Sequence, residues 1–151
     1  MRRTILVVLM LLLGSMPGAV HAQSSAPSGP PTMSIAPGVT AEVLAFMQGQ
    51  GDPVVVRLRF DPGSTWDAPA DPTIALATVE SGTLVVTLDK DVTAYLPGGA
   101  AGQPTTAGTA TTMPQGTYFL APTDVAGHFA NESGQDASLV IAVLQVSSAA
   151  P

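Results

Sequence analysis

The chain has 151 residues, no cysteine and a formal net charge of −6, because 11 acidic residues outnumber five basic ones. A surface this acidic repels the phosphates of nucleic acids, and the few basic residues form no stripe that could bind them or an anionic lipid. The absence of cysteine excludes disulfides, so stability must come from a hydrophobic core. We therefore expect a folded domain that has no nucleic-acid partner.

The first 22 residues have the organisation of a secretory signal peptide. Arg2 and Arg3 precede an uninterrupted apolar run of nine residues, Ile5–Leu13. The last residues up to Ala22 have small or compact side chains at the positions that signal peptidase recognises. Nine apolar residues are well short of the roughly 20 that a membrane-spanning helix requires. We expect cleavage at about Ala22, no membrane span, and a protein that is secreted to the periplasm or the extracellular space.

The mature chain is expected to contain one domain. Residues 23–37 are rich in Ser and Pro without apolar periodicity, which predicts a flexible tether. The domain is expected over residues 38–147 and a disordered tail over 148–151. Beyond residue 22 only Arg57, Arg59 and Lys90 remain to balance the 11 acidic residues, so the formal charge falls to −8.

From Val39 onward the pattern is that of β structure. In residues 53–60, Val54, Val56, Leu58 and Phe60 fall on one face, and Arg57 and Arg59 on the other, as a half-buried antiparallel strand requires. Strands are predicted at about 39–46, 53–60, 74–80, 83–88, 92–96, 117–121, 126–131 and 137–146. Residues 97–115 are rich in Gly, Ala and Thr and predict either a mobile loop or a loosely paired edge. Short strands at this spacing favour an all-β, mostly antiparallel sandwich or jelly-roll barrel.

Two segments resemble the conserved motifs of the cupin superfamily. Residues 60–89 resemble the first motif, with the Glu80-Ser81-Gly82 turn, and residues 116–144 resemble the second, with Gly116, Pro122 and Asn131 at the expected spacing. The resemblance covers most of residues 38–146 and implies a cupin-like jelly-roll barrel. It also implies a divalent metal held by two histidines and a glutamate from the first motif and a histidine from the second.

All four of these implied metal-ligand positions depart from the family pattern. Counting from Gly82 and Pro122 places Pro69, Asp71, Ala75 and Gly127 there. His128 follows the last position by one residue, and neighbouring side chains of a strand point to opposite faces. We therefore expect no metal ligands, no cofactor and no catalytic residues of the family type.

Five residues remain as candidates for a ligand pocket: Trp66, Asp67, Asp71, Phe119 and His128. Asp67 and Asp71 could form a carboxylate pair at the mouth of the barrel, or could serve the turns around them. Trp66 and Phe119 could line a small apolar cavity or belong to the core. A surface His128 could hydrogen-bond to Asn131 or Asp124.

The leading interpretation is an exported, metal-free cupin-like domain that binds a small neutral or apolar molecule, or serves as a structural or interaction module, without catalysis. The alternative is a metal-dependent cupin enzyme, of dioxygenase or isomerase type, that uses Asp71, His128 and Asp67 as substituted ligands. That alternative predicts an inward-pointing His128 within reach of Asp67 or Asp71. A third alternative is a homodimer, which the apolar segment 138–146 favours.

Overall fold

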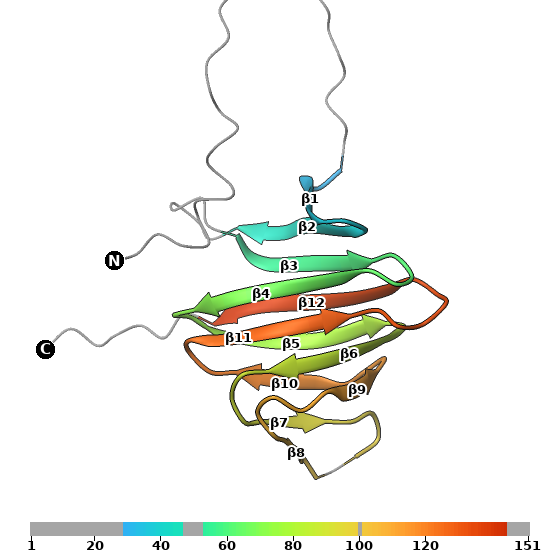
Figure 1. The fold of residues 1–151 in the computed structure, drawn as a ribbon. Coiled ribbons are helices and arrows are strands. Elements are labelled where there is room, and N and C mark those ends of the chain that lie inside the picture. The colour runs from blue at the N-terminus through green and yellow to red at the C-terminus, as the bar shows by residue number, and fades with distance from the viewer. Residues whose placement is uncertain (1–28, 47–52, 100, 145–151) are drawn as a thin grey trace, which may run out of the picture.

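The computed structural model describes residues 29–46, 53–99 and 101–144, and within these ranges all regular structure is β-strand (Figure 1). In chain order the strands are β1 (Thr32–Ala36), β2 (Val39–Phe46), β3 (Pro53–Phe60), β4 (Thr65–Asp71), β5 (Ile74–Ser81), β6 (Thr83–Leu88), β7 (Val92–Tyr95), β8 (Gln103–Thr105), β9 (Thr111–Pro114), β10 (Tyr118–Ala121), β11 (Val125–Ala130) and β12 (Ala137–Leu144). No helix in this part of the chain is long and apolar enough to cross a membrane.

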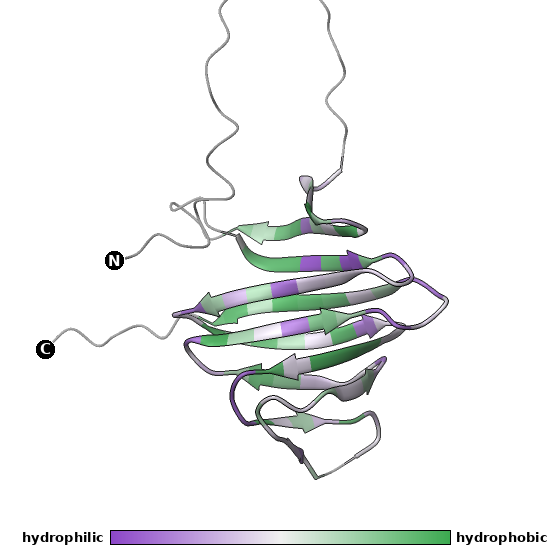
Figure 2. Ribbon diagram, viewed as in Figure 1, coloured by the Kyte–Doolittle hydropathy of each residue, from purple (hydrophilic) through white to green (hydrophobic). Residues whose placement is uncertain are grey.

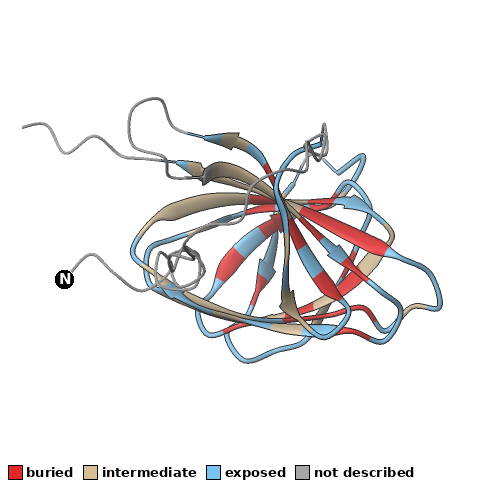
Figure 3. Cartoon of the chain, turned by 90° about the horizontal axis from the view of Figure 1, so that it is seen from above, coloured by how far each residue is buried: buried red, intermediate tan, exposed pale blue. Residues whose placement is uncertain are grey.

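The strands form two antiparallel sheets that lie face to face. The larger sheet has the order β1-β2-β3-β12-β5-β10-β7-β8, and the smaller one the order β4-β11-β6-β9. Figure 1 shows the smaller sheet in front of the larger one, and Figure 3 shows the buried segments gathered between them. The expected all-β jelly roll is confirmed.

Burial of every second side chain places the core between the sheets. In β6, Leu84, Val86 and Leu88 are buried, whereas the residues between them are only partly covered. Phe60 and Phe119 of the larger sheet join the same buried cluster. Figure 2 shows this sheet as mostly hydrophobic, with hydrophilic bands on β3. Each fully buried large apolar side chain contributes on the order of 2 kcal/mol to folding.

The Glu80-Ser81-Gly82 turn depends on its glycine. Gly82 has a φ of 71°, in the left-handed region that residues with a Cβ rarely adopt. A Cβ on Gly82 would also lie 2.7 Å from the carbonyl oxygen of Asp136. The turn therefore brings β5 and β6, which belong to different sheets, against the connection that leads into β12.

The predicted strands agree closely with the structure, and four further strands escaped prediction. The strands predicted at 39–46, 53–60 and 83–88 have the observed bounds, the others differ at their ends by one or two residues, and residues 145–146 lie outside the described residues. β4 was missed because Pro69 and four other small or acidic residues give it a poor β composition. It lies at the edge of the smaller sheet, where a proline is tolerated because no neighbour needs its missing N–H.

The prediction of a tether over residues 23–37 is wrong for its last part. Residues 32–36 form β1, which pairs with β2, and Met33 and Ile35 pack against the core cluster. Two apolar side chains at period two were enough to hold this short edge strand. The predicted signal peptide, residues 23–28 of the tether and the tail at 148–151 lie outside the described residues.

The glycine- and threonine-rich segment 97–115 contains two short strands. β8 pairs with β7 at the end of the larger sheet, and β9 pairs with β6 at the end of the smaller sheet. The amide of Gly108, between them, donates to the carbonyl oxygen of Leu88 at 2.7 Å. Of the two predictions for this segment, the structure favours the paired edge.

Candidate functional site

Gly127 of β11 lies on the inner face of the smaller sheet, at the position that the family pattern reserves for the histidine of the second motif. It pairs with Ala68 of β4 and with Leu88 of β6, and its neighbour two residues on, Phe129, is buried. A Cβ built on Gly127 would lie 2.8 Å from Cδ2 of Leu88 and 3.0 Å from Cε2 of Phe129. The space for a ligand side chain is therefore filled by two apolar side chains.

The positions from the first motif also fail to form a donor set. Ala75 lies in β5 opposite Ala121 and Val143. Asp71 is engaged locally, since its Oδ1 accepts hydrogen bonds from the Thr73 amide at 2.7 Å and from the Thr73 hydroxyl. The described residues contain no group of three or more His, Cys, Asp or Glu side chains that could hold a metal ion. The residues present do not fit the metal centre that the family resemblance implies.

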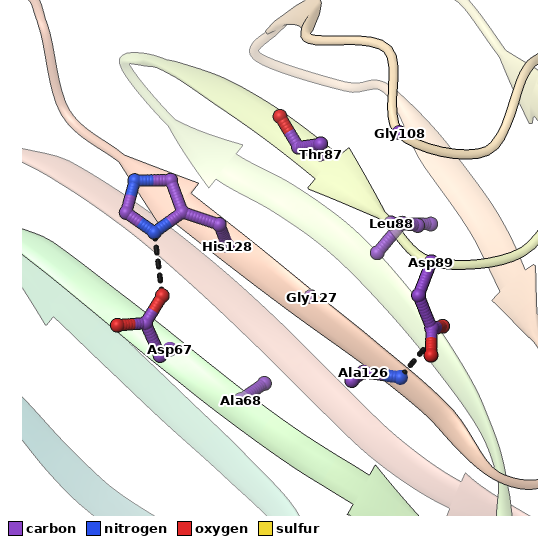
Figure 4. Close-up of a pocket in the computed structure, with 9 residues that line it drawn as sticks. All are labelled: Asp67, Ala68, Thr87, Leu88, Asp89, Gly108, Ala126, Gly127 and His128. Atoms are coloured by element: carbon purple, nitrogen blue, oxygen red, sulfur yellow. Dashed lines mark hydrogen bonds and ion pairs between the residues drawn. The ribbon is translucent and has the colours of Figure 1, made fainter.

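His128 lies on the opposite, outer face of the smaller sheet. Its Nδ1 lies 2.6 Å from Oδ1 of Asp67, and the two side chains are 48% and 87% exposed (Figure 4). The metal-enzyme alternative predicted that His128 lies close to Asp67, with the imidazole pointing into the barrel. The two side chains are close, but their exposure contradicts the inward direction. The suggested bonds to Asn131 or Asp124 are also wrong, because the register of β11 and β4 sets His128 directly opposite Asp67.

An open hollow of about 330 Å³ lies beside this histidine–aspartate pair. It is lined by Asp67, Ala68, Thr87, Leu88, Asp89, Gly108, Ala126, Gly127 and His128. Asp67 and His128 lie at one end and Asp89 at the other (Figure 4), where the Asp89 carboxylate accepts a hydrogen bond from the Ala126 amide at 2.9 Å. Between these ends the lining is mostly apolar, so the hollow suits a small molecule with a polar group at one edge.

The other pocket candidates lie elsewhere. Trp66 packs on Phe129 with ring centroids 5.5 Å apart, and Phe119 is buried in the core. Asp71 does not line the hollow, and its bonds to Thr73 serve the turn after β4. Of the five candidates the structure thus brings together only Asp67 and His128.

Sequence reasoning missed Thr87, Asp89 and Gly108 as lining residues. Thr87 and Asp89 lie at the end of β6, which pairs with β11, and Gly108 lies before β9, where its amide donates to the carbonyl oxygen of Leu88. Nothing in the local sequence signals this pairing, because about 40 residues separate Thr87 from His128.

Asn131 of the second motif has a structural role. It is buried, and its Nδ2 donates to the carbonyl oxygens of Phe60, Asp61 and Gln135 at 3.1, 3.2 and 2.8 Å. Its Oδ1 accepts from the Ser133 amide and hydroxyl. The side chain thereby joins the β3–β4 turn to the β11–β12 connection.

Comparison with known proteins finds similar folds but no similar sequences. No family model matches the chain, and no curated protein matches it in sequence. Among solved structures, the cupin domain of CENP-C from Drosophila melanogaster is similar at 13% identity and a TM-score of 0.53, with 87% of this chain and 86% of that chain covered. A crystal structure of that protein has CAL1 bound.

Two bacterial proteins are similar in the same way. KdgF from Halomonas sp. matches at 14% identity, covering 78% of this chain and 88% of its own, with a TM-score of 0.52. Salicylate 1,2-dioxygenase from Pseudoaminobacter salicylatoxidans matches at 16% identity, covering 72% of this chain and 26% of its own, with a TM-score of 0.50. The sheets, their packing and these similarities together identify the fold of the chain as that of the cupin superfamily.

Proposed function

We propose that the protein is an exported, metal-free cupin-fold domain that acts as a binding and interaction module and not as an enzyme. The observation that carries this proposal is the filled ligand position, where Leu88 and Phe129 take the space beside Gly127. The core cluster is apolar, and the position implied for the histidine of the second motif is surrounded by apolar side chains.

The similar structures support a non-catalytic role as one use of the fold. They include the CENP-C cupin domain, crystallised with CAL1, as well as a dioxygenase. The fold alone therefore does not distinguish a catalytic from a non-catalytic role, and the distinction has to come from the residues of the site. Here the donor set is missing at the position where the dioxygenase type of chemistry would require it.

Metal analysis of the purified mature chain tests the proposal. We expect less than about one metal ion per ten chains after exposure to Mn, Fe, Ni, Zn or Cu and desalting, and no specific thermal stabilisation by any of them. One tightly bound ion per chain would overturn the proposal. The variant His128→Ala serves as the control, because it removes weak binding by the exposed imidazole and leaves the interior unchanged.

Export is tested separately. The signal-peptide pattern predicts that the secreted protein begins at about Gln23, which N-terminal sequencing or intact mass measures directly. An uncleaved chain retained in the cytoplasm would refute export and would leave the metal-free interior as a separate question.

The hollow beside His128 favours a second candidate function, the binding of a small neutral or apolar molecule. Its volume and mostly apolar lining fit a compact ligand, and Asp67 and Asp89 offer acceptors at either end. Titration with a fragment library, followed by NMR, should shift the amides of Ala126 and Gly127 together. If the fragments that bind leave these amides unshifted, the hollow is not the site.

A further inference from the structure

The hollow beside His128 presents mainly hydrogen-bond acceptors to a ligand. Asp67 and Asp89 contribute carboxylates at its opposite ends (Figure 4). An ionised carboxylate can only accept, so Nδ1 of His128, which lies 2.6 Å from Oδ1 of Asp67, donates that bond. The neutral imidazole then keeps its Nε2 as a further acceptor. Both ends of the hollow therefore favour a ligand that donates hydrogen bonds.

The backbone donors around the hollow are already engaged. The Gly108 amide donates to the carbonyl oxygen of Leu88 at 2.7 Å, and the Asp89 amide donates to that of Ala126 at 3.0 Å. The Ala126 amide donates to the Asp89 carboxylate at 2.9 Å. Among the described residues this is the one hydrogen bond of the Asp89 carboxylate, so its second oxygen remains for a ligand. A ligand that needs donors from the protein would find few of them here.

The charge of the lining has one sign. The nine lining residues include two carboxylates but neither lysine nor arginine. Lys90, next to Asp89 in the chain, donates from Nζ to the carbonyl oxygen of Thr123 at 2.9 Å, and Arg57 and Arg59 are paired with glutamates of the larger sheet. The formal charge of −8 beyond residue 22 attracts cations to the whole surface. These charges favour a positively charged ligand.

The strand registers set the separation of the two carboxylates. Asp67 of β4 pairs with His128, which pairs on its other side with Thr87 of β6. Asp89 follows Thr87 by two residues and so returns to the same face of the sheet. With strands about 4.8 Å apart and same-face residues about 6.8 Å apart, the Cα atoms of Asp67 and Asp89 lie roughly 12 Å from each other. One small cation cannot contact both carboxylates across this distance.

A linear diamine that is protonated at both ends has the chemistry that this hollow requires. Each ammonium group donates to one carboxylate, and the methylene chain between them crosses the apolar middle formed by Ala68, Leu88 and Gly127. An ammonium nitrogen approaches a carboxylate oxygen to about 2.8 Å, so a chain of about six to eight carbons spans the two ends.

We propose that the hollow binds linear aliphatic diamines, with one ammonium group at Asp67 and the other at Asp89. This proposal rests on the binding role proposed above for the hollow, and it assigns that site a doubly charged ligand in place of a neutral one. The hollow is open and its charges are exposed, so we expect a dissociation constant on the order of 1 mM.

NMR titration of the mature chain at low salt tests the proposal with ligands of one length. Heptamethylenediamine should shift the amides of Gly108, Ala126 and Gly127 together. Heptylamine, which has the same chain and one charge, should bind about five- to tenfold more weakly, and heptanol more weakly still. Trimethylenediamine is too short to span the carboxylates and should bind no more tightly than heptylamine.

Substitution of one carboxylate tests the two-ended contact. Asp89→Asn removes the charge and keeps an oxygen for the Ala126 amide. The advantage of heptamethylenediamine over heptylamine should then fall to about twofold, which is the statistical factor for two identical ends. Asp67→Asn should act in the same way. Asp136→Asn is the matched control, because it removes an equal charge at an exposed position outside the lining and should leave the advantage unchanged.

The outcomes separate the ligand class from the binding role. The proposal is overturned if heptamethylenediamine binds no more tightly than heptylamine, or if its advantage survives both Asp89→Asn and Asp67→Asn. Shifts confined to acidic turns outside the hollow would show general attraction of cations and would also overturn it. If heptanol shifts the same amides as tightly as the diamine, the diamine proposal fails while the binding of neutral molecules in the hollow is supported.

Discussion

Replacing Gly127 by alanine tests whether Leu88 and Phe129 fill the ligand position that the resemblance implies. In a strand, glycine to alanine ordinarily stabilises a protein by about 0.4–1 kcal/mol, because the unfolded chain loses freedom. Here the new Cβ would lie 2.8 Å from Leu88 Cδ2 and 3.0 Å from the Phe129 ring, and both side chains are buried. Overpacking of this kind costs typically 1–3 kcal/mol, so we expect a net loss of about 1–2 kcal/mol.

Urea unfolding followed by the fluorescence of Trp66 measures this loss. Trp66 is the one tryptophan of the chain and packs on Phe129, so it reports directly on the affected region. The control is Gly134→Ala, at an exposed glycine with no heavy atom near its would-be Cβ, which should be neutral or stabilising.

A second substitution isolates the contact. Leu88→Val removes the Cδ atoms that crowd position 127. The double variant with Gly127→Ala should therefore lose about 1 kcal/mol less unfolding free energy than the two single losses added together. If Gly127→Ala behaves like Gly134→Ala, the position is open and the argument for a metal-free interior loses its basis.

Three further results are expected. Asn131→Ala should cost about 2–4 kcal/mol in urea unfolding, because it leaves three carbonyl oxygens without their donor; a loss under 1 kcal/mol would contradict the joining role. The hydrogen bonds from Arg57 lower the pKa of Glu80, so their stabilisation is present above the unfolded pKa of about 4.3 and is lost as pH falls through the lowered folded value. The stability difference between the unaltered chain and Arg57→Gln should therefore shrink from pH 7 to pH 3, and a constant difference would refute this linkage. The exposed pair of His128 and Asp67 should contribute under about 1 kcal/mol, so His128→Ala should barely change the unfolding midpoint at pH 6.

Much of the fold was predictable because a strand with one buried face shows its period in the sequence. β3 alternates apolar side chains with Arg57 and Arg59, and β6 and β12 contain runs of β-branched and aliphatic side chains. β8 and β9 are short and polar, and β4 contains Pro69, so these edge strands have little intrinsic preference and form through their neighbours. Their absence from the prediction reflects that dependence.

The candidate site was predictable only in part. Counting along the second motif separates Gly127 from His128, and the period of two then assigns them to opposite faces. Counting residues does not reveal that Asp67 lies opposite His128. That placement depends on the register between β4 and β11 and on the register shift between Val125 and Gly127. It also leaves open which side chains occupy the space beside Gly127.

The sequence alone determined the all-β class, the acidic charge and the departure of four positions from the metal-ligand pattern that the resemblance implies, because composition, local period and residue spacing are properties of the chain itself. Tertiary structure decided that Leu88 and Phe129 close the interior. It also decided that Tyr118 and Val140, which are far apart in the chain, both lie beside Thr78 of β5. Both outcomes depend on which strands become neighbours and in which register, and that choice is made by the packing of the whole core.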